Sequence, residues 1–124
     1  MTCAFAWKEN LVWVTNIVFE SINDALTQIA PAEANSKEEH KFVDRYIRKA
    51  EGFFPGYVFQ LEEFTSDKSE LLFWRRCFIT LAQKVYNREV GNQEDQTWQI
   101  WYISDVLKIA KLMSDAAADL EGKE

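Results

Sequence analysis

The strongest constraint on the fold of this chain is a helical pattern of apolar residues near its C-terminal end. Between residues 98 and 120, apolar side chains recur at spacings of three and four residues: Trp98, Tyr102, Val106, Ile109, Met113, Ala116 and Leu120. This is the period of an amphipathic α-helix with one buried stripe. The pattern therefore predicts one long helix over residues 98–120.

A similar pattern covers residues 11–29, where apolar side chains recur at helical spacing. Residues 11–19 are also rich in Val, Ile, Trp and Thr, which favour strands, so a strand is the alternative for this part. We expect a helix because the helical period continues well beyond the length of a normal strand. Pro31 is expected to close this helix.

Two capping signatures predict the starts of further helices. Ser36 and Glu39 are spaced as a capping box, in which the two side chains satisfy backbone donors of the first turn. Asp67 and Glu70 have the same spacing ahead of a long amphipathic segment. The helix that begins at Asp67 is expected to run to about Val90.

The segment from Tyr57 to Phe64 is the most ambiguous part of the sequence. Pro55 and Gly56, just before it, fit the two central positions of a type II turn. The spacing of its apolar residues suits a short helix, whereas its β-branched and aromatic residues equally suit a strand. We expect a short helix.

Length and composition favour one compact domain. Of 124 residues, 48% are hydrophobic, and there are only four glycines and two prolines. The predicted fold is an all-α, single-domain antiparallel bundle of four or five helices over residues 1–124, with long first and last helices near each other. Residues 115–124 carry four acids against one lysine, so we expect an acidic, frayed tail.

Charge and cysteine content narrow the classes of function. The chain has 14 Lys and Arg against 20 Asp and Glu, a formal net charge of −6. Nucleic-acid binding needs a cationic surface, so no direct nucleic-acid partner is expected. The longest uncharged run, residues 10–19, is about half of the length that a membrane-spanning helix needs, so no membrane association is expected. Cys3 and Cys77 show no metal-ligand spacing, which favours free thiols in the cytoplasm.

Candidate catalytic groups are few. His40 is the only histidine, so a Ser-His-Asp triad would have to use it. Asp44 lies four residues on, but charged residues surround His40, which is the pattern of a solvated helix surface. The four scattered glycines form no phosphate-binding loop, and no Glu-x-x-His motif is present. We therefore expect a protein that is not an enzyme and has no metal and no cofactor.

Aromatic residues are unusually frequent, with five Trp, nine Phe and four Tyr. Many fall on predicted buried stripes, but Trp13 departs from the stripe of its segment, and five large apolar residues surround the turn at residues 53–59. Exposed aromatic residues beside acids are typical of protein-binding surfaces, whereas the same rings could instead plug the end of the bundle. The predicted partner-binding residues are Phe53, Phe54, Tyr57, Phe59, Glu62, Glu63, Glu94, Asp95 and Trp98. The next candidate surface is the basic row Lys41, Arg45 and Arg48, which otherwise pairs with neighbouring acids.

These features predict a small acidic cytoplasmic protein-binding module. In size, acidity and helicity the chain is similar to immunity proteins, antitoxins and other inhibitors that neutralise a toxin or nuclease, although this likeness covers no motif. Such a module would occlude a partner with a basic surface. A subunit of a larger assembly and a helical ligand binder with an aromatic-lined pocket are the alternatives. A homodimer also remains open.

Overall fold

The computed structural model describes residues 2–89 and 96–121, and within these ranges it contains five helices and a three-stranded sheet. The helices are α1 (Asn16–Glu33), α2 (Lys37–Ala50), α3 (Leu61–Phe64), α4 (Lys68–Tyr86) and α5 (Gln96–Glu121). The strands are β1 (Thr2–Trp7), β2 (Asn10–Thr15) and β3 (Val58–Gln60). The prediction of an all-α bundle is therefore wrong, because the fold is mixed α/β.

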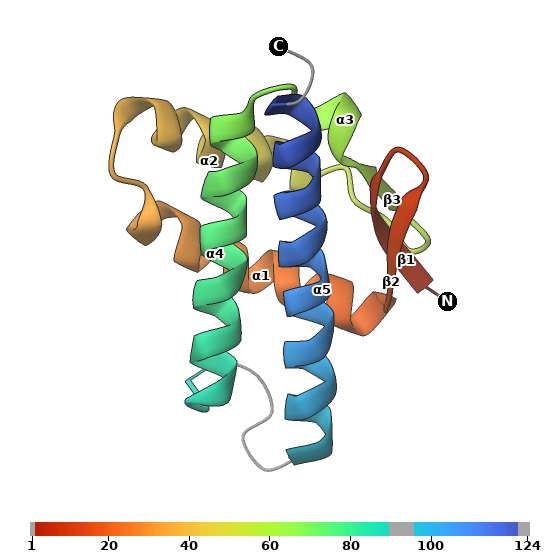
Figure 1. Cartoon of the computed structure of the whole chain (residues 1–124). Helices are drawn as coiled ribbons and strands as arrows, with labels where there is room; N and C mark the ends of the chain where they lie inside the picture. Colours follow the sequence, from red (N-terminus) through yellow and green to blue (C-terminus); the bar gives the residue numbers. More distant parts are fainter. Residues whose placement is uncertain (1, 90–95, 122–124) are drawn as a thin grey trace.

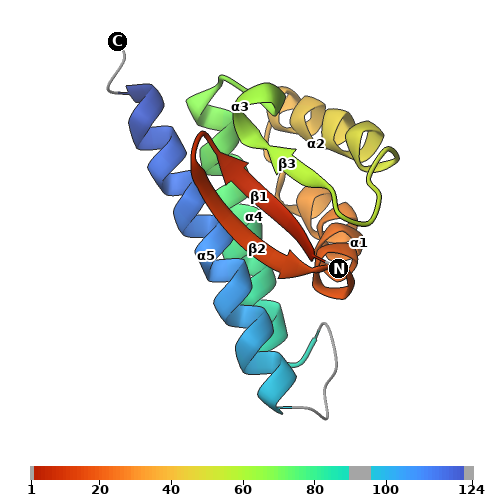
Figure 2. The same ribbon diagram turned by 90° about the vertical axis from the view of Figure 1, so that its right-hand side faces the viewer.

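The helices and the sheet lie on different sides of the molecule. Figure 1 shows α4 and α5 side by side and antiparallel, with α1 crossing behind both of them. Figure 2, turned by a quarter, shows the sheet as the outermost layer on another side of the molecule. The α4–α5 pair, α1 and the sheet therefore present three differently directed surfaces.

The sheet has the strand order β2-β1-β3. β1 and β2 form an antiparallel hairpin whose two-residue turn begins at Lys8, where φ is 54°. β3 pairs parallel to β1, with Phe5 opposite Phe59. This pairing joins segments more than fifty residues apart, so no local pattern in the sequence points to it.

The boundary between β2 and α1 corrects the predicted helix over residues 11–29. The strand alternative holds for residues 11–15, and Thr15 then caps α1 by accepting a hydrogen bond from the Val18 N–H at 3.2 Å. The helix runs to Glu33, past Pro31. Because proline lacks only its own N–H, its position in the last turn costs α1 one internal hydrogen bond and does not end the helix.

The ambiguous segment from Tyr57 to Phe64 contains both a short strand and a short helix. Residues 58–60 form β3, and α3 follows directly from residue 61. The expectation of a helix throughout is wrong, because Phe59 points from β3 into the core and aligns the backbone with β1.

The two capping signatures have different outcomes. Ser36 caps α2 by accepting from the Glu39 N–H at 3.1 Å, which confirms this half of the predicted capping box, whereas the Glu39 carboxylate accepts from the N–H of Asn35, one residue before the cap, at 2.9 Å. Asp67 caps α4 by accepting from the Ser69 N–H at 2.8 Å. Glu70, its expected reciprocal partner, is instead fully buried.

The C-terminal ends of the two longest predicted helices also differ in outcome. α4 ends at Tyr86 and not near Val90, because Arg88 takes a left-handed conformation with φ 61° just after the helix. The long C-terminal helix is confirmed as α5, which extends to Glu121. Within the predicted tail, residues 115–121 are therefore helical, and residues 122–124 lie outside the described residues.

The core is built around aromatic rings from several elements. Phe5, in the middle of the central strand, stacks on Phe59 at a centroid distance of 5.7 Å. It also meets Phe19 of α1 at 5.4 Å and Phe78 of α4 at 5.8 Å. One face of the sheet therefore packs against the helices through an aromatic contact, worth about 1 kcal/mol per ring pair beyond the area it buries.

Candidate protein-binding surface

The aromatic turn that the sequence singled out is divided between the core and the surface. Phe59 is buried, and Phe53 and Tyr57 are half-buried against Phe19 of α1, at centroid distances of 5.3 and 6.3 Å. Only Phe54 projects outward, with 59% of its surface exposed. Most of the predicted aromatic surface is thus part of the core.

The remaining predicted site residues do not form one cluster. Glu62 and Glu63 lie in α3, beside the C-terminal end of α5, whereas Trp98 lies in the first turn of α5 at its other end (Figure 1). A helix of 26 residues is about 39 Å long, so one compact interface cannot include both groups. Glu94 and Asp95 lie outside the described residues.

A different surface, on the sheet, carries exposed apolar side chains. The register of the sheet places Ala4 opposite both Trp13 and Val58, and Ala6 opposite both Leu11 and Gln60. Residues paired across strands point to the same face of a sheet. We define the outer sheet face by the six residues Ala4, Ala6, Leu11, Trp13, Val58 and Gln60.

None of the described helices covers the outer sheet face, as Figure 2 shows. Trp13 is 56% exposed, and Leu11 and Val58 are also exposed. Ala4 and Ala6, between these larger side chains, are completely buried. A sheet that meets water on one face normally carries polar side chains there, so an apolar face of this kind indicates a binding surface.

Acidic side chains gather at one end of the outer sheet face. The N–H of Lys8, in the β1–β2 turn, donates to a carboxylate oxygen of Glu62, which brings the turn against α3. Glu9 in the same turn and Glu63 in α3 are exposed. The apolar face is therefore bordered by carboxylates, with Glu62 already engaged in the fold.

Two contacts join the β1–β2 hairpin to α5. The indole N–H of Trp7 donates to Asp119 at 3.0 Å, and the ammonium group of Lys8 forms an ion pair with the same carboxylate. At the other end of β1, the Cys3 thiol donates to the side-chain oxygen of Asn16 at 2.9 Å. Both ends of β1 are therefore joined to neighbouring elements.

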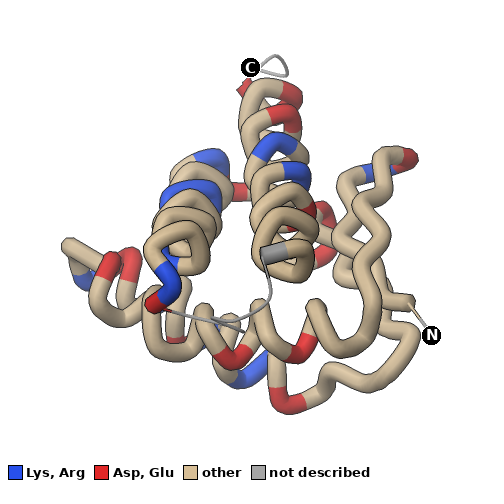
Figure 3. Tube along the Cα trace, turned by 90° about the horizontal axis from the view of Figure 1, so that it is seen from below, with Lys and Arg blue, Asp and Glu red and all other residues tan. Residues whose placement is uncertain are grey.

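A groove of about 860 Å³ between α1 and α4 provides a second acidic surface. Glu20, Asp24 and Glu33 of α1 and Glu89 line it, against Lys84 of α4. Figure 3 shows the acids along α1 and the basic residues along α4. α1 contains no Lys or Arg, so its exposed side contributes negative charge alone.

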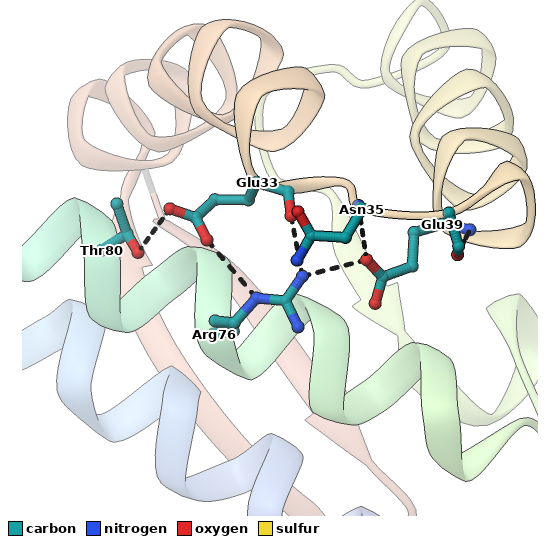
Figure 4. Close-up of polar contacts among 6 residues, drawn as sticks. Glu33, Asn35, Glu39, Arg76 and Thr80 are labelled. Atoms are coloured by element: carbon teal, nitrogen blue, oxygen red, sulfur yellow. Dashed lines mark hydrogen bonds and ion pairs between the residues drawn. The ribbon is translucent and has the colours of Figure 1, made fainter.

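Arg76 on α4 forms hydrogen bonds and ion pairs with residues of α1 and α2 (Figure 4). Its guanidinium donates to the backbone carbonyl of Glu33 at 2.8 Å and to the Glu39 carboxylate at 3.0 Å, while Thr80 donates to the Glu33 carboxylate at 3.1 Å. Burial disfavours the ionised carboxylate of Glu39, but the N–H of Asn35 and the guanidinium outweigh it, so the pKa of Glu39 lies below its usual range. Arg76 therefore ties α1 and α2 to α4.

The basic row on α2 is not a single cationic surface. Arg45 forms an ion pair with the buried Glu70, and its guanidinium lies 4.6 Å from the centre of the Phe64 ring. Lys41 and Arg48 are exposed. The expectation that this row pairs with neighbouring acids is confirmed for Arg45.

His40 and its neighbours lie on the solvent-facing side of α2. His40 and Asp44 are both exposed, and the backbone N–H of His40 donates to the Ser36 carbonyl within the first turn.

In the part of the chain that the structure describes, no three His, Cys, Asp or Glu side chains lie close enough to share a metal ion. None of the described helices has both the length and the apolar content needed to cross a lipid bilayer.

No protein-family model matches the chain, and comparison with curated proteins and with solved structures finds no significant similarity. The function must therefore be inferred from the surfaces of this chain.

The residues that sequence reasoning missed are Leu11 and Trp13 on the outer sheet face. The available signal was the strand alternative for residues 11–19 together with the departure of Trp13 from the helical stripe. In a strand, Leu11 and Trp13 share one face while Val12 and Val14 share the other. Because both faces are apolar here, the alternation that identifies a half-buried strand is absent from the sequence.

Proposed function

We propose that this chain is a small acidic protein-binding module that occludes a partner protein through its outer sheet face. The observation that carries the proposal is the uncovered apolar face with exposed Leu11, Trp13 and Val58, which is bordered by Glu9 and Glu63. A partially exposed tryptophan among aliphatic side chains is the usual composition of an energetic centre in a protein interface.

The charge of the molecule supports a partner with a basic surface. The chain carries a net charge of −6, and the acids at the end of the sheet and along α1 are exposed. Such a field raises the association rate with a cationic partner, by roughly tenfold or more at low salt, and salt screens it. The apolar face then provides the desolvated contact that slows dissociation.

We further propose that the module is an inhibitor of the type of immunity proteins and antitoxins, has no catalytic activity of its own and acts in the cytoplasm. Occlusion requires only an apolar surface and a complementary charge, which the sheet and the acids beside it and along α1 supply. Cys3 and Cys77 are buried free thiols, and burial raises the pKa of Cys77 to about 12. Unreactive thiols of this kind suit a reducing compartment.

The proposal is tested by affinity purification of the tagged chain from its native cell, followed by mass spectrometry and by binding measurements with the isolated partner. Leu11→Glu is expected to weaken binding at least tenfold, because it places a charge within the apolar contact. Leu107→Glu is the matched control, since Leu107 on α5 is 46% exposed and Leu11 is 45% exposed.

The expected partner is a single basic protein whose association slows as salt rises. Equal losses for both variants, or a loss confined to Leu107→Glu, would place the interface elsewhere. Recovery of several proteins in fixed stoichiometry would replace the inhibitor with a subunit of a larger assembly.

A further inference from the structure

β2 forms one edge of the three-stranded sheet, because the strand order is β2-β1-β3. The other edge is β3, which is only three residues long and continues directly into α3. β2 has six residues and pairs with β1 along its whole length, without a bulge. The sheet therefore has one long edge, on the side of β2 that faces away from β1.

The backbone hydrogen bonds of β1 show which groups of β2 face this edge. The Ala4 N–H donates to the Tyr57 carbonyl at 3.1 Å, so Ala4 turns its backbone groups away from β2. In an antiparallel ladder, the residue opposite such a position also turns its N–H and C=O outward. Trp13 lies opposite Ala4, and Leu11, two residues earlier, lies opposite Ala6. We define the free edge of β2 by the N–H and C=O groups of Leu11 and Trp13.

The free edge of β2 has none of the features that normally protect an edge strand. Such strands are usually short, or carry charged residues, prolines or bulges that prevent another strand from pairing. Residues 10–15 include no charged residue, no proline and no glycine. Among the described residues, none hydrogen-bonds to the main chain of Leu11 or Trp13 at this edge. The row of donors and acceptors fits an extended polypeptide segment.

The side chains beside the free edge indicate what an added strand would carry on each face. Residues directly opposite each other on neighbouring strands share a face of the sheet. Leu11 and Trp13 lie on the outer sheet face and are exposed, so apolar residues opposite them would extend that face. Val12, between them, lies on the other face and packs against the core. Residues opposite Val12 would lie on the side of the sheet where α5 runs.

The surroundings of the free edge are acidic at both ends. β2 contacts α5, and Asp119 of α5 accepts from the Trp7 indole at the hairpin end (Figure 2). Asp105 lies fourteen residues before Asp119, nearly four helical turns or about 21 Å, which is close to the length of β2. Burial raises the pKa of Asp105, and Lys108 offsets only part of this rise. Glu9, at the opposite end of β2, is exposed.

From the free edge and its surroundings we infer that the partner adds an extended segment to β2 as a fourth strand, with apolar side chains beside Leu11 and Trp13 and Lys or Arg side chains on the opposite face. This inference rests on the proposed function and specifies how the partner engages the outer sheet face. Backbone hydrogen bonds provide affinity, and the alternating side chains provide selectivity. A second copy of this chain is a poorer occupant, because two chains of net charge −6 repel each other.

Amide hydrogen exchange, followed residue by residue by NMR, tests whether the edge is free. In the chain alone, the Leu11 and Trp13 amides should exchange roughly tenfold or more faster than those of Val12 and Val14, which face β1. Equal protection of all four in dilute solution would show that another part of this chain covers the edge. Protection that rises with concentration would identify a second copy as the occupant. Either result overturns the inference.

The probe for the added strand is the capped heptapeptide Lys-Val-Lys-Val-Lys-Val-Lys, at millimolar concentration and low salt. At saturation it is expected to slow exchange at Leu11 and Trp13 by about fivefold or more. The control peptide has proline in place of the central valine, which keeps the charge and removes a backbone N–H. It is expected to give no protection. Equal protection by both peptides, or protection by neither, overturns the inference.

Leu11→Pro tests the same contact from the side of this chain. Proline is tolerated in an edge strand where its missing N–H had no partner within the sheet. Leu11→Ala is the matched control, because it removes the leucine side chain and keeps the N–H. Leu11→Pro is expected to bind the heptapeptide about fivefold more weakly than Leu11→Ala, since one hydrogen bond is lost. Equal binding by two folded variants overturns the inference, and the peptide pair decides if Leu11→Pro does not fold.

The added strand and the proposed function fail separately. Leu11→Glu and Leu107→Glu, measured with the captured partner, test whether the outer sheet face is the interface. The peptides and hydrogen exchange need no captured partner. If the peptides give no protection while Leu11→Glu still weakens partner binding, the outer sheet face remains the interface and the added strand is excluded.

Discussion

Glu70 lies in an environment that its position in the sequence does not indicate, because a glutamate in the first turn of a helix is expected to be exposed. It is completely buried, forms an ion pair with Arg45 and accepts from the indole N–H of Trp74 at 3.1 Å. An ionised carboxylate without partners is costly in the interior, and these two contacts offset that cost.

We expect Arg45→Ala to lower the free energy of unfolding by about 2 kcal/mol or more, because it leaves the buried carboxylate without its cation. Arg48→Ala, an exposed position on the same helix, is the control and should change stability by less than about 0.5 kcal/mol. Denaturant unfolding measures both. Equal effects would show that Trp74 alone satisfies Glu70.

Glu39 provides a pH-dependent contribution at the residue scale. Its pKa in the folded chain lies below the ordinary value of 4.5, so its ionised form stabilises the fold. This contribution is complete above pH 4.5 and is lost as the pH falls through the lower folded pKa. Glu39→Gln should therefore destabilise the chain by about 1 kcal/mol at neutral pH and less in acid.

The control for this prediction is Glu38→Gln, which changes an exposed carboxylate one residue away. Unfolding curves at neutral and acidic pH give the difference between each variant and the wild type. A Glu39→Gln difference that stays constant down to the acid limit would assign the effect to packing and not to charge.

The end of α4 shows how an element is closed by a residue that does not favour the required conformation. The Arg88 N–H donates to the Val85 carbonyl at 3.0 Å, and the Glu89 N–H donates to the Lys84 carbonyl at 2.8 Å. These are the two hydrogen bonds of a Schellman motif, in which glycine usually occupies the left-handed position. Arg88 takes that position with φ 61°.

We expect Arg88→Gly to be more stable than Arg88→Ala by about 1 kcal/mol, because glycine adopts positive φ without steric cost. Comparison of these two variants removes the arginine side chain from both, so the difference reports the backbone alone. Thermal or denaturant unfolding measures it. Equal stabilities would mean that this helix end relaxes away from the left-handed conformation.

At the same scale, the long-range sheet is what the sequence did not predict. α2 and α5 follow from periodicity, and the cap of α2 from Ser36 and Glu39, because these signals are local. β1 has no such signal, since Ala4 and Ala6 are poor strand formers and its partner β3 is only three residues long. The strand forms because Phe5 packs between Phe59 and the helices.

At the scale of the whole molecule, charged and exposed apolar side chains lie on different sides. The acids lie along α1 and at the end of the sheet, the cations of α4 are partly used in ion pairs, and the sheet with its apolar outer face lies on another side of the molecule than α1. The acidic side of α1 and the apolar outer sheet face therefore do not overlap.

The sequence by itself determined the long helices, the cap of α2 and the net charge, because each depends on neighbouring residues or on composition. Only the tertiary structure decided which aromatic residues are exposed. Phe59 and Trp13 are both large and apolar, yet Phe59 is buried and Trp13 is not. The difference lies in which face of a sheet each residue occupies, and pairing between distant segments sets that face.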